Sequence, residues 1–159
     1  MSNTPPPASA VPPLTLYLVK RLENAIRALL DDALRPLGVT TQQYTALTVL
    51  ERRGGLSSAQ LARRAFLRPQ TMHEMVSMLE KRGLISRESH ETNRRVLVAR
   101  LTDAGRALLE EAAPRVTELE NAMLDGLSGD ERDNFRDVLL RGASSLTAFA
   151  VDRRLAGSR

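Results

Sequence analysis

Arginine and lysine side chains gather in the middle of this chain, and the chemistry they favour is the binding of anions. Between residues 57 and 100 the sequence has nine lysines and arginines against four acids, whereas the whole chain has a net charge of +4. Such a local excess of cations is typical of a surface that binds a polyanion. A basic face that is merely solvated is the alternative interpretation of the composition.

Catalytic and metal-binding motifs are poorly represented. His73-Glu74 resembles the start of a zinc-protease motif, but position 77 is Ser and the second histidine is missing. The chain has no cysteine, which excludes disulfides and thiolate metal sites. No nucleophile lies beside a base in the sequence. We therefore expect neither an enzyme nor a bound cofactor or metal.

Two short helices joined by a tight turn are predicted for residues 57–81. Ser57 and Gln60 have the spacing of a capping box, so a helix should run from there to about Ala65. Pro69 cannot continue this helix, but it suits the first turn of a new one. The pattern predicts a helix-turn-helix with its turn at residues 66–68.

The second of these helices has one apolar and one polar side. The apolar side, expected to face the core, holds Met72, Met75, Val76 and Leu79. The opposite side holds Gln70, Glu74, Ser77 and Lys81, flanked by Thr71 and His73. One side of the helix can pack while the other is free to bind.

A β-hairpin with a charged tip should follow this helix. Gly83 ends the helix, and the apolar segments 84–87 and 95–101 flank a polar stretch, with Arg94-Arg95 where this stretch gives way to the second segment. A guanidinium is always charged and weakly hydrated, so it suits the narrow minor groove of DNA, where negative potential is concentrated. A helix-turn-helix followed by such a hairpin is a winged helix, whose recognition helix fits the major groove.

Long amphipathic helices are predicted on both sides of this block, which makes the protein mainly α. Capping boxes at Thr40 with Gln43 and at Ser128 with Glu131 mark two further helix starts. The outer helices carry more apolar positions than a winged helix can cover, and such surface is normally buried against a partner. We therefore expect a homodimer.

One domain is expected at residues 14–151, with dimerisation helices at 14–37 and 102–151 and a DNA-binding lobe at 40–101. Five prolines within residues 1–13 predict a disordered or polyproline-like arm, and residues 152–159 are predicted to be a flexible tail. No apolar run approaches the roughly 20 residues that cross a bilayer. We expect a cytoplasmic protein without membrane contact.

Three motifs resemble the MarR family of bacterial transcription regulators: LEKRGLI at the end of the recognition helix, the charged turn ending in NRR, and LTDAG after the second wing strand. The resemblance covers roughly residues 14–149. It implies winged helix-turn-helix homodimers on pseudo-palindromic operators, many of them repressors released by a small phenolic or anionic effector. Two departures are Asn93, where the family commonly has an acid, and His73-Glu74, where many members have Thr and Arg.

The candidate DNA-contacting residues follow from the winged helix and its basic surface. Cations near the turn and wing are assigned to phosphates or the minor groove, and the polar side of the recognition helix to bases or phosphates. The set is Arg63, Arg64, Arg68, Gln70, Thr71, His73, Glu74, Ser77, Lys81, Arg87, Arg94 and Arg95. Which arginine of the wing tip enters the groove stays open, because Asn93 lacks the carboxylate that would orient one of them.

An effector pocket is hypothesised where the first and second helices meet. Tyr17 and Tyr44 are the two tyrosines of the chain, and Arg21 lies one helical turn beyond Tyr17. The resemblance implies an effector cavity near this junction, which makes the three residues candidates for a mixed aromatic and cationic pocket. Core or interface packing of the two tyrosines is the alternative.

The sequence therefore predicts a homodimeric repressor that binds double-stranded DNA. A winged-helix scaffold that binds only protein partners is the alternative function. The two differ in salt dependence, because phosphate contacts weaken steeply as ionic strength rises.

Overall fold

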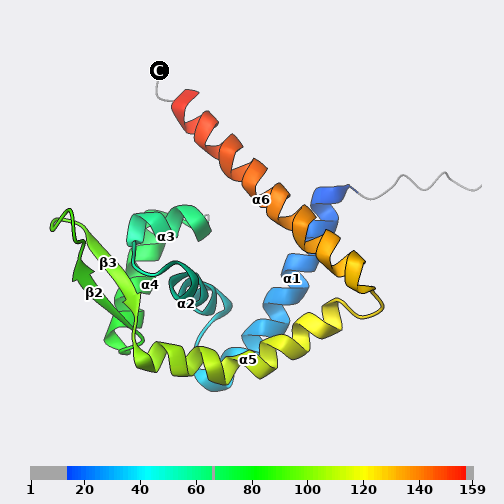
Figure 1. Cartoon of the computed structure of the whole chain (residues 1–159), viewed down its shortest axis with the longest axis horizontal. Coiled ribbons are helices and arrows are strands. Elements are labelled where there is room, and N and C mark those ends of the chain that lie inside the picture. The colour runs from blue at the N-terminus through cyan, green and yellow to red at the C-terminus, as the bar shows by residue number, and fades with distance from the viewer. Residues whose placement is uncertain (1–13, 66, 157–159) are drawn as a thin grey trace, which may run out of the picture. The chain divides into compact units, whose positions relative to one another are not determined.

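The structure is a computed structural model that describes residues 14–65 and 67–156. The predicted arm at residues 1–13 lies outside the described residues. Within them the elements follow in the order α1 (Thr15–Leu34), η1 (Arg35–Leu37), α2 (Thr41–Arg53), β1 (Leu56–Ser57), α3 (Ser58–Ala65), α4 (Pro69–Lys81), β2 (Ile85–Ser89), β3 (Leu97–Leu101), α5 (Asp103–Met123) and α6 (Gly129–Ala156) (Figure 1). The mainly helical class and the helix-turn-helix followed by a wing are confirmed. Helix α6 extends to Ala156, beyond the predicted end at residue 151.

The sheet has three antiparallel strands in the order β1-β3-β2. Strands β2 and β3 form the predicted wing hairpin, with Ile85 opposite Leu101 and Ser89 opposite Leu97. The short strand β1 was not predicted, and it pairs Leu56 with Ala99 and Ser57 with Val98. This pairing ties the base of the wing to the start of α3.

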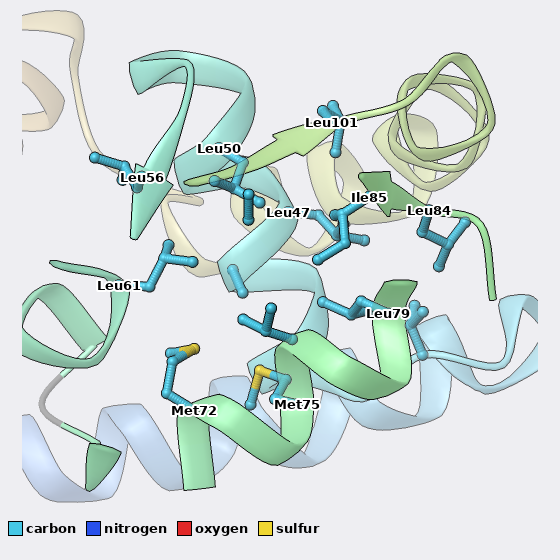
Figure 2. Packing of buried hydrophobic residues seen from close by; sticks show 14 of the residues in the cluster. Leu47, Leu50, Leu56, Leu61, Met72, Met75, Leu79, Leu84, Ile85 and Leu101 are labelled. Atoms are coloured by element: carbon cyan, nitrogen blue, oxygen red, sulfur yellow. The ribbon is translucent and has the colours of Figure 1, made fainter. Parts of the chain in front are cut away.

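The hydrophobic core lies between the helices of the winged-helix lobe and the base of its wing (Figure 2). The predicted apolar side of α4 is buried in it: Met72, Met75, Val76 and Leu79. Leu34, the last residue of α1, is fully buried in the same cluster. The rotation of α4 about its axis is therefore fixed by apolar packing, at about 1.5–3 kcal/mol for each large side chain removed from water.

Helix ends follow the capping patterns of the sequence. Thr40 and Gln43 form the predicted capping box of α2, and the backbone N–H of Gln60 donates to Ser57 Oγ at 3.2 Å. Helix α4 ends at Lys81 with Gly83 just beyond, in the left-handed region at φ 71°. There Leu84 N–H donates to the Leu79 carbonyl at 3.0 Å, which closes a Schellman motif.

The chain divides into two compact units, and the boundary along the sequence falls between Leu119 and Glu120. The core belongs to the first unit. In the second unit α6 begins with the predicted capping box, since Ser128 N–H donates to Glu131 Oε2 at 2.8 Å and Glu131 N–H donates to Ser128 Oγ at 3.3 Å. Large apolar side chains of α6 are exposed in the single chain: Val138, Leu139, Leu140, Leu146, Phe149 and Val151.

Gly105, in the first turn of α5, allows that helix to start against the end of α4. A Cβ atom at this position would lie 2.2 Å from the Leu84 carbonyl oxygen and 2.8 Å from Leu101 Cδ1. Thr102 fixes the approach, because its Oγ1 donates to the Gly83 carbonyl at 2.6 Å and accepts from Gly105 N–H at 3.1 Å. The glycine of the LTDAG motif is therefore required by packing.

Replacing Gly105 with alanine should lower the free energy of unfolding by roughly 1–3 kcal/mol, because the backbone of Leu84 cannot easily move away from an added methyl group. Thermal and urea unfolding followed by circular dichroism would measure the loss. Gly129→Ala is the control, since a Cβ there meets nothing within 4 Å. Equal stability of Gly105→Ala and the wild type would contradict the close approach.

Candidate nucleic-acid interface

Helix α4 presents its predicted polar side to solvent. Its first turn starts at Pro69, and its N-cap residue is Arg68, whose backbone is extended. The polar residues Gln70, Thr71, His73, Glu74 and Lys81 are exposed, and Ser77 is half-buried. Since the opposite side is in the core, this face of α4 is free to enter a groove of DNA.

Cations lie beside the start of α4. Arg63 and Arg64 are exposed in the last turn of α3, and Arg68 is exposed in the connection that follows. Phe66, in the predicted turn, lies outside the described residues. The backbone N–H of Leu67 donates to the Ala62 carbonyl at 3.0 Å, so the chain leaves α3 in a compact turn. All three arginines are accessible to an external anion, and their contact with phosphates stays a prediction.

The tip of the wing is shaped by Asn93. Its side-chain oxygen accepts from Arg95 N–H at 3.2 Å, and its carbonyl accepts from Val96 N–H at 2.9 Å. Arg94 and Arg95 are exposed, and neither has an ion-pair partner among the described residues. Asn93 therefore holds the turn through the backbone, and both guanidinium groups remain available for an external anion.

Arg87 connects the wing to the recognition helix. Its Nε donates to Glu80 Oε2 at 2.8 Å, and its Nη2 contacts the same oxygen. The Arg87 hydrogen bond lowers the pKa of Glu80 below its ordinary value of 4.5, and Glu80 in turn raises the pKa of Arg87. The pair fixes β2 against the last turn of α4, and DNA contact by Arg87 itself stays a prediction.

Arg82 connects the other side of α4 to the turn between α1 and α2. Its Nη1 donates to the Gly38 carbonyl at 2.5 Å and its Nη2 to the Leu37 carbonyl at 3.3 Å. As a cation just beyond the last turn of α4, Arg82 is also favoured by the helix dipole. The partners could not be found from the sequence, because they lie more than forty residues earlier in the chain.

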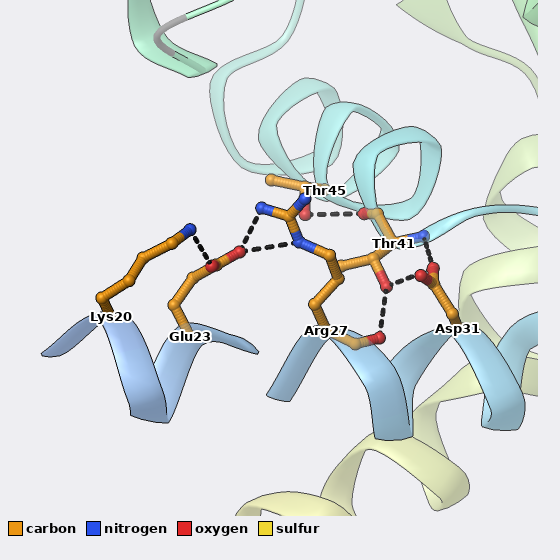
Figure 3. Close-up of polar contacts among 6 residues, drawn as sticks. All are labelled: Lys20, Glu23, Arg27, Asp31, Thr41 and Thr45. Carbon is orange, nitrogen blue, oxygen red and sulfur yellow. Dashed lines mark hydrogen bonds and ion pairs between the residues drawn. The ribbon is translucent and has the colours of Figure 1, made fainter. Parts of the chain in front are cut away.

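Asp31 joins α1 to the first residue of α2 (Figure 3). Its Oδ1 accepts from Thr41 N–H at 2.8 Å and from Thr41 Oγ1 at 2.7 Å. These hydrogen bonds, the backbone one first, lower the pKa of Asp31. A carboxylate at this end of α2 is also favoured by the helix dipole. Together with Arg82, Asp31 sets how α1 meets the winged-helix lobe.

Only part of the hypothesised effector site is brought together. The guanidinium carbon of Arg21 lies 5.8 Å from the centre of the Tyr17 ring, which is cation–π distance. Tyr17 is 56% exposed, whereas Tyr44 is half-buried and packs against the core. Large apolar residues at the start of α1, including its N-cap residue Leu14, are exposed near Tyr17 in the sequence: Leu14, Leu16, Leu18 and Val19. Effector binding by the three residues stays a prediction.

Metal clusters and membrane-spanning helices are both absent from the part of the chain that the structure describes. It contains no group of three or more His, Asp or Glu side chains placed to hold a metal ion. None of its helices is long and apolar enough to cross a membrane.

The order of elements, the exposed polar face of α4 and the basic tip of the wing define a winged helix-turn-helix protein. Residues 37–96 match the family model described as MarR family. The HTH-type transcriptional repressor Rv2887 of Mycobacterium tuberculosis is 35% identical over 123 residues, which are 77% of this chain and 88% of that protein. The chain belongs to the MarR family of transcriptional regulators.

Solved structures agree with this assignment. The structure of Rv2887 in complex with p-aminosalicylic acid has a TM-score of 0.66 and 32% identity, and the match covers 81% of this chain and 98% of that one. CouR from Rhodococcus jostii RHA1, bound to p-coumaroyl-CoA, has a TM-score of 0.76 and 25% identity, with 86% and 96% covered.

The Glu80–Arg87 pair predicts a pH-dependent contribution to stability. Because the pKa of Glu80 is lowered in the folded state, its contribution should be complete above about pH 4.5 and lost as the pH falls through the folded-state pKa. Urea unfolding of the wild type and Glu80→Gln should therefore differ at pH 7 and converge in acid. Glu91→Gln, at an exposed wing position, is the control for removing one charge. A difference between wild type and Glu80→Gln that stays constant with pH would contradict the ion pair.

Proposed function

We propose that this protein is a repressor that binds double-stranded DNA in a sequence-specific manner. The observation that carries the proposal is the fixed polar face of α4 beside a wing tip whose Arg94 and Arg95 have no ion-pair partner among the described residues. The helix has the size that the major groove admits, and the wing tip has the charge that the minor groove attracts. Membership of a family of transcriptional regulators supports the same function. The activity is binding, not catalysis, and it belongs in the cytoplasm with the DNA.

The proposed contacts divide into two kinds. Base or phosphate contacts are assigned to the polar face of α4: Gln70, Thr71, His73, Glu74, Ser77 and Lys81. Backbone or minor-groove contacts are assigned to the cations around it: Arg63, Arg64, Arg68, Arg87, Arg94 and Arg95. Phosphate contacts position a protein on the duplex, and base contacts give it sequence preference.

The functional form is proposed to be a homodimer. Exposed apolar side chains of α1 and α6 support it, because a lone chain rarely leaves so many large apolar groups in water. The outer helices would form the interface, and the lobe at residues 40–101 would contact DNA. A two-fold dimer places its recognition helices about one DNA turn apart, roughly 34–36 Å, and therefore requires a pseudo-palindromic operator.

A small phenolic or anionic effector is proposed to release the DNA. Tyr17 and Arg21 supply an aromatic and a cationic group on α1, and Tyr44 lies on the helix that follows. The complex of Rv2887 with p-aminosalicylic acid supports a ligand of this class. A shift of α1 would be passed to α2 through the hydrogen bond between Asp31 and Thr41. It would be passed to α4 through Arg82, which binds the Gly38 carbonyl in the turn after α1. A ligand can change DNA affinity only by its differential affinity for the two states.

A scaffold that binds protein partners only is the competing function. The exposed apolar residues of α6 favour it, because they would suit a partner helix as well as a second copy. Salt dependence separates the two functions, since an apolar protein interface lacks the counterion release of phosphate contacts.

Alanine at both Arg94 and Arg95 should weaken operator binding and reduce the slope of log affinity against log salt by about two, one for each lost contact to phosphate or groove. Fluorescence anisotropy over a range of NaCl concentrations measures the slope. The double variant Arg35→Ala/Arg106→Ala is the charge-matched control, since these arginines pair with exposed acids in the chain. An unchanged slope for the wing variant would contradict the role of the tip.

Arg21→Ala and Tyr17→Phe should blunt release of DNA by p-aminosalicylic acid while leaving DNA affinity without ligand nearly unchanged. Loss of a charge-assisted contact should raise the ligand concentration needed by about tenfold for Arg21→Ala. Anisotropy of the protein–DNA complex titrated with the ligand measures this, and Lys20→Ala is the control on the same helix. Loss of DNA binding in the absence of ligand would instead indicate a structural role. A wild-type complex that the ligand does not release would contradict this ligand class.

A further inference from the structure

Glu74 is out of place on a surface that approaches DNA. It is exposed in the middle of α4, and no lysine or arginine of the described residues forms an ion pair with it. The other acid of the helix, Glu80, is half-buried and neutralised by Arg87. An exposed carboxylate on the reading face repels phosphate, so it favours binding only where it meets a hydrogen-bond donor.

Gln70 lies one helical turn before Glu74 and orients its carboxylate. Its Nε2 donates to Glu74 Oε1 at 3.0 Å. Since an ionised carboxylate only accepts hydrogen bonds, this contact fixes which end of the amide faces Glu74. The second carboxylate oxygen, Oε2, has no hydrogen bond from the described residues and stays free to accept. The pair therefore presents an oriented acceptor in the N-terminal half of α4, the part of a recognition helix that contacts base edges.

We propose that Glu74 selects a cytosine in the operator, by accepting a hydrogen bond from the cytosine N4 amino group, and that Gln70 is its positioning residue. The inference rests on the proposed function. In the major groove guanine and thymine present acceptors, which a carboxylate repels, and adenine places its N7 acceptor beside its amino group. Cytosine alone presents a donor without an acceptor of its own. The charge that weakens non-specific binding thereby gives sequence preference.

A binding-site selection from random duplexes tests the assignment with five proteins: wild type, Glu74→Gln, Gln70→Ala, the double variant Gln70→Ala/Glu74→Gln, and Glu91→Gln. The wild type should select cytosine at one fixed position of each half-site. Glu74→Gln should lose that preference and shift it toward adenine, because an amide pairs with adenine through a donor and an acceptor. Glu91→Gln removes the same charge from an exposed wing position and should select the wild-type sequence. Gln70→Ala should weaken the cytosine preference, with no further loss when combined with Glu74→Gln.

A base analogue tests the proposed hydrogen bond by comparison between variants, since the Watson–Crick hydrogen bond that it also removes is lost equally for every protein. Replacing the selected cytosine with 2-pyrimidinone removes only the 4-amino group. This should cost the wild type and Glu91→Gln on the order of tenfold in affinity, and cost Glu74→Gln little. Equal loss in all three proteins would overturn the proposed contact, because the analogue would then act through the duplex alone.

The outcomes separate this inference from the function on which it rests. If the wild type and Glu74→Gln select the same operator sequence, only the role of Glu74 is overturned. If the wild type selects adenine, and this preference is lost in Gln70→Ala but kept in Glu74→Gln, then Gln70 contacts the base directly and the inference is overturned. A wild type that enriches no sequence would overturn the proposed function together with it.

Discussion

The burial of one side of α4 is the constraint on which the rest of the structure depends. Met72, Val76 and Leu79 are almost completely inaccessible, so α4 cannot rotate about its axis without exposing them. The same packing turns Gln70, His73 and Glu74 outward. A recognition surface needs fixed positions for its side chains, and here the core supplies them.

Polar contacts then hold the C-terminal end of α4 to its neighbours. Arg82 binds the turn between α1 and α2, and Glu80 binds Arg87 on the wing. Thr102, just before α5, donates to the carbonyl of Gly83, just after α4. Each contact is modest, since all are at least partly exposed to solvent. Their value lies in geometry, because they set where the wing and the outer helix stand relative to the reading face.

Local patterns in the sequence were sufficient to predict most elements of the fold. The capping boxes at Thr40, Ser57 and Ser128 act over three residues, and the apolar stripe of α4 repeats over one helix, so both can be recognised without tertiary information. Strand β1 could not be found in this way, because it is two residues long and pairs with β3 some forty residues later. Contacts distant in sequence, such as Asp31 with Thr41 and Arg82 with Gly38, were missed for the same reason. The exposure of the polar side of α4 and of Arg94 and Arg95 could be predicted from the sequence, whereas which of the candidate residues already have partners within the chain required the structure. Their contacts with DNA stay predictions.

Sedimentation of the wild type with a duplex obtained by binding-site selection tests the central claim most directly. The predicted result is a complex of two chains per duplex that dissociates as the NaCl concentration is raised. Both DNA-binding lobes of a two-fold dimer should contact the same operator, and their phosphate contacts weaken with salt. A single chain that shows no association with duplex DNA even in dilute salt would contradict it.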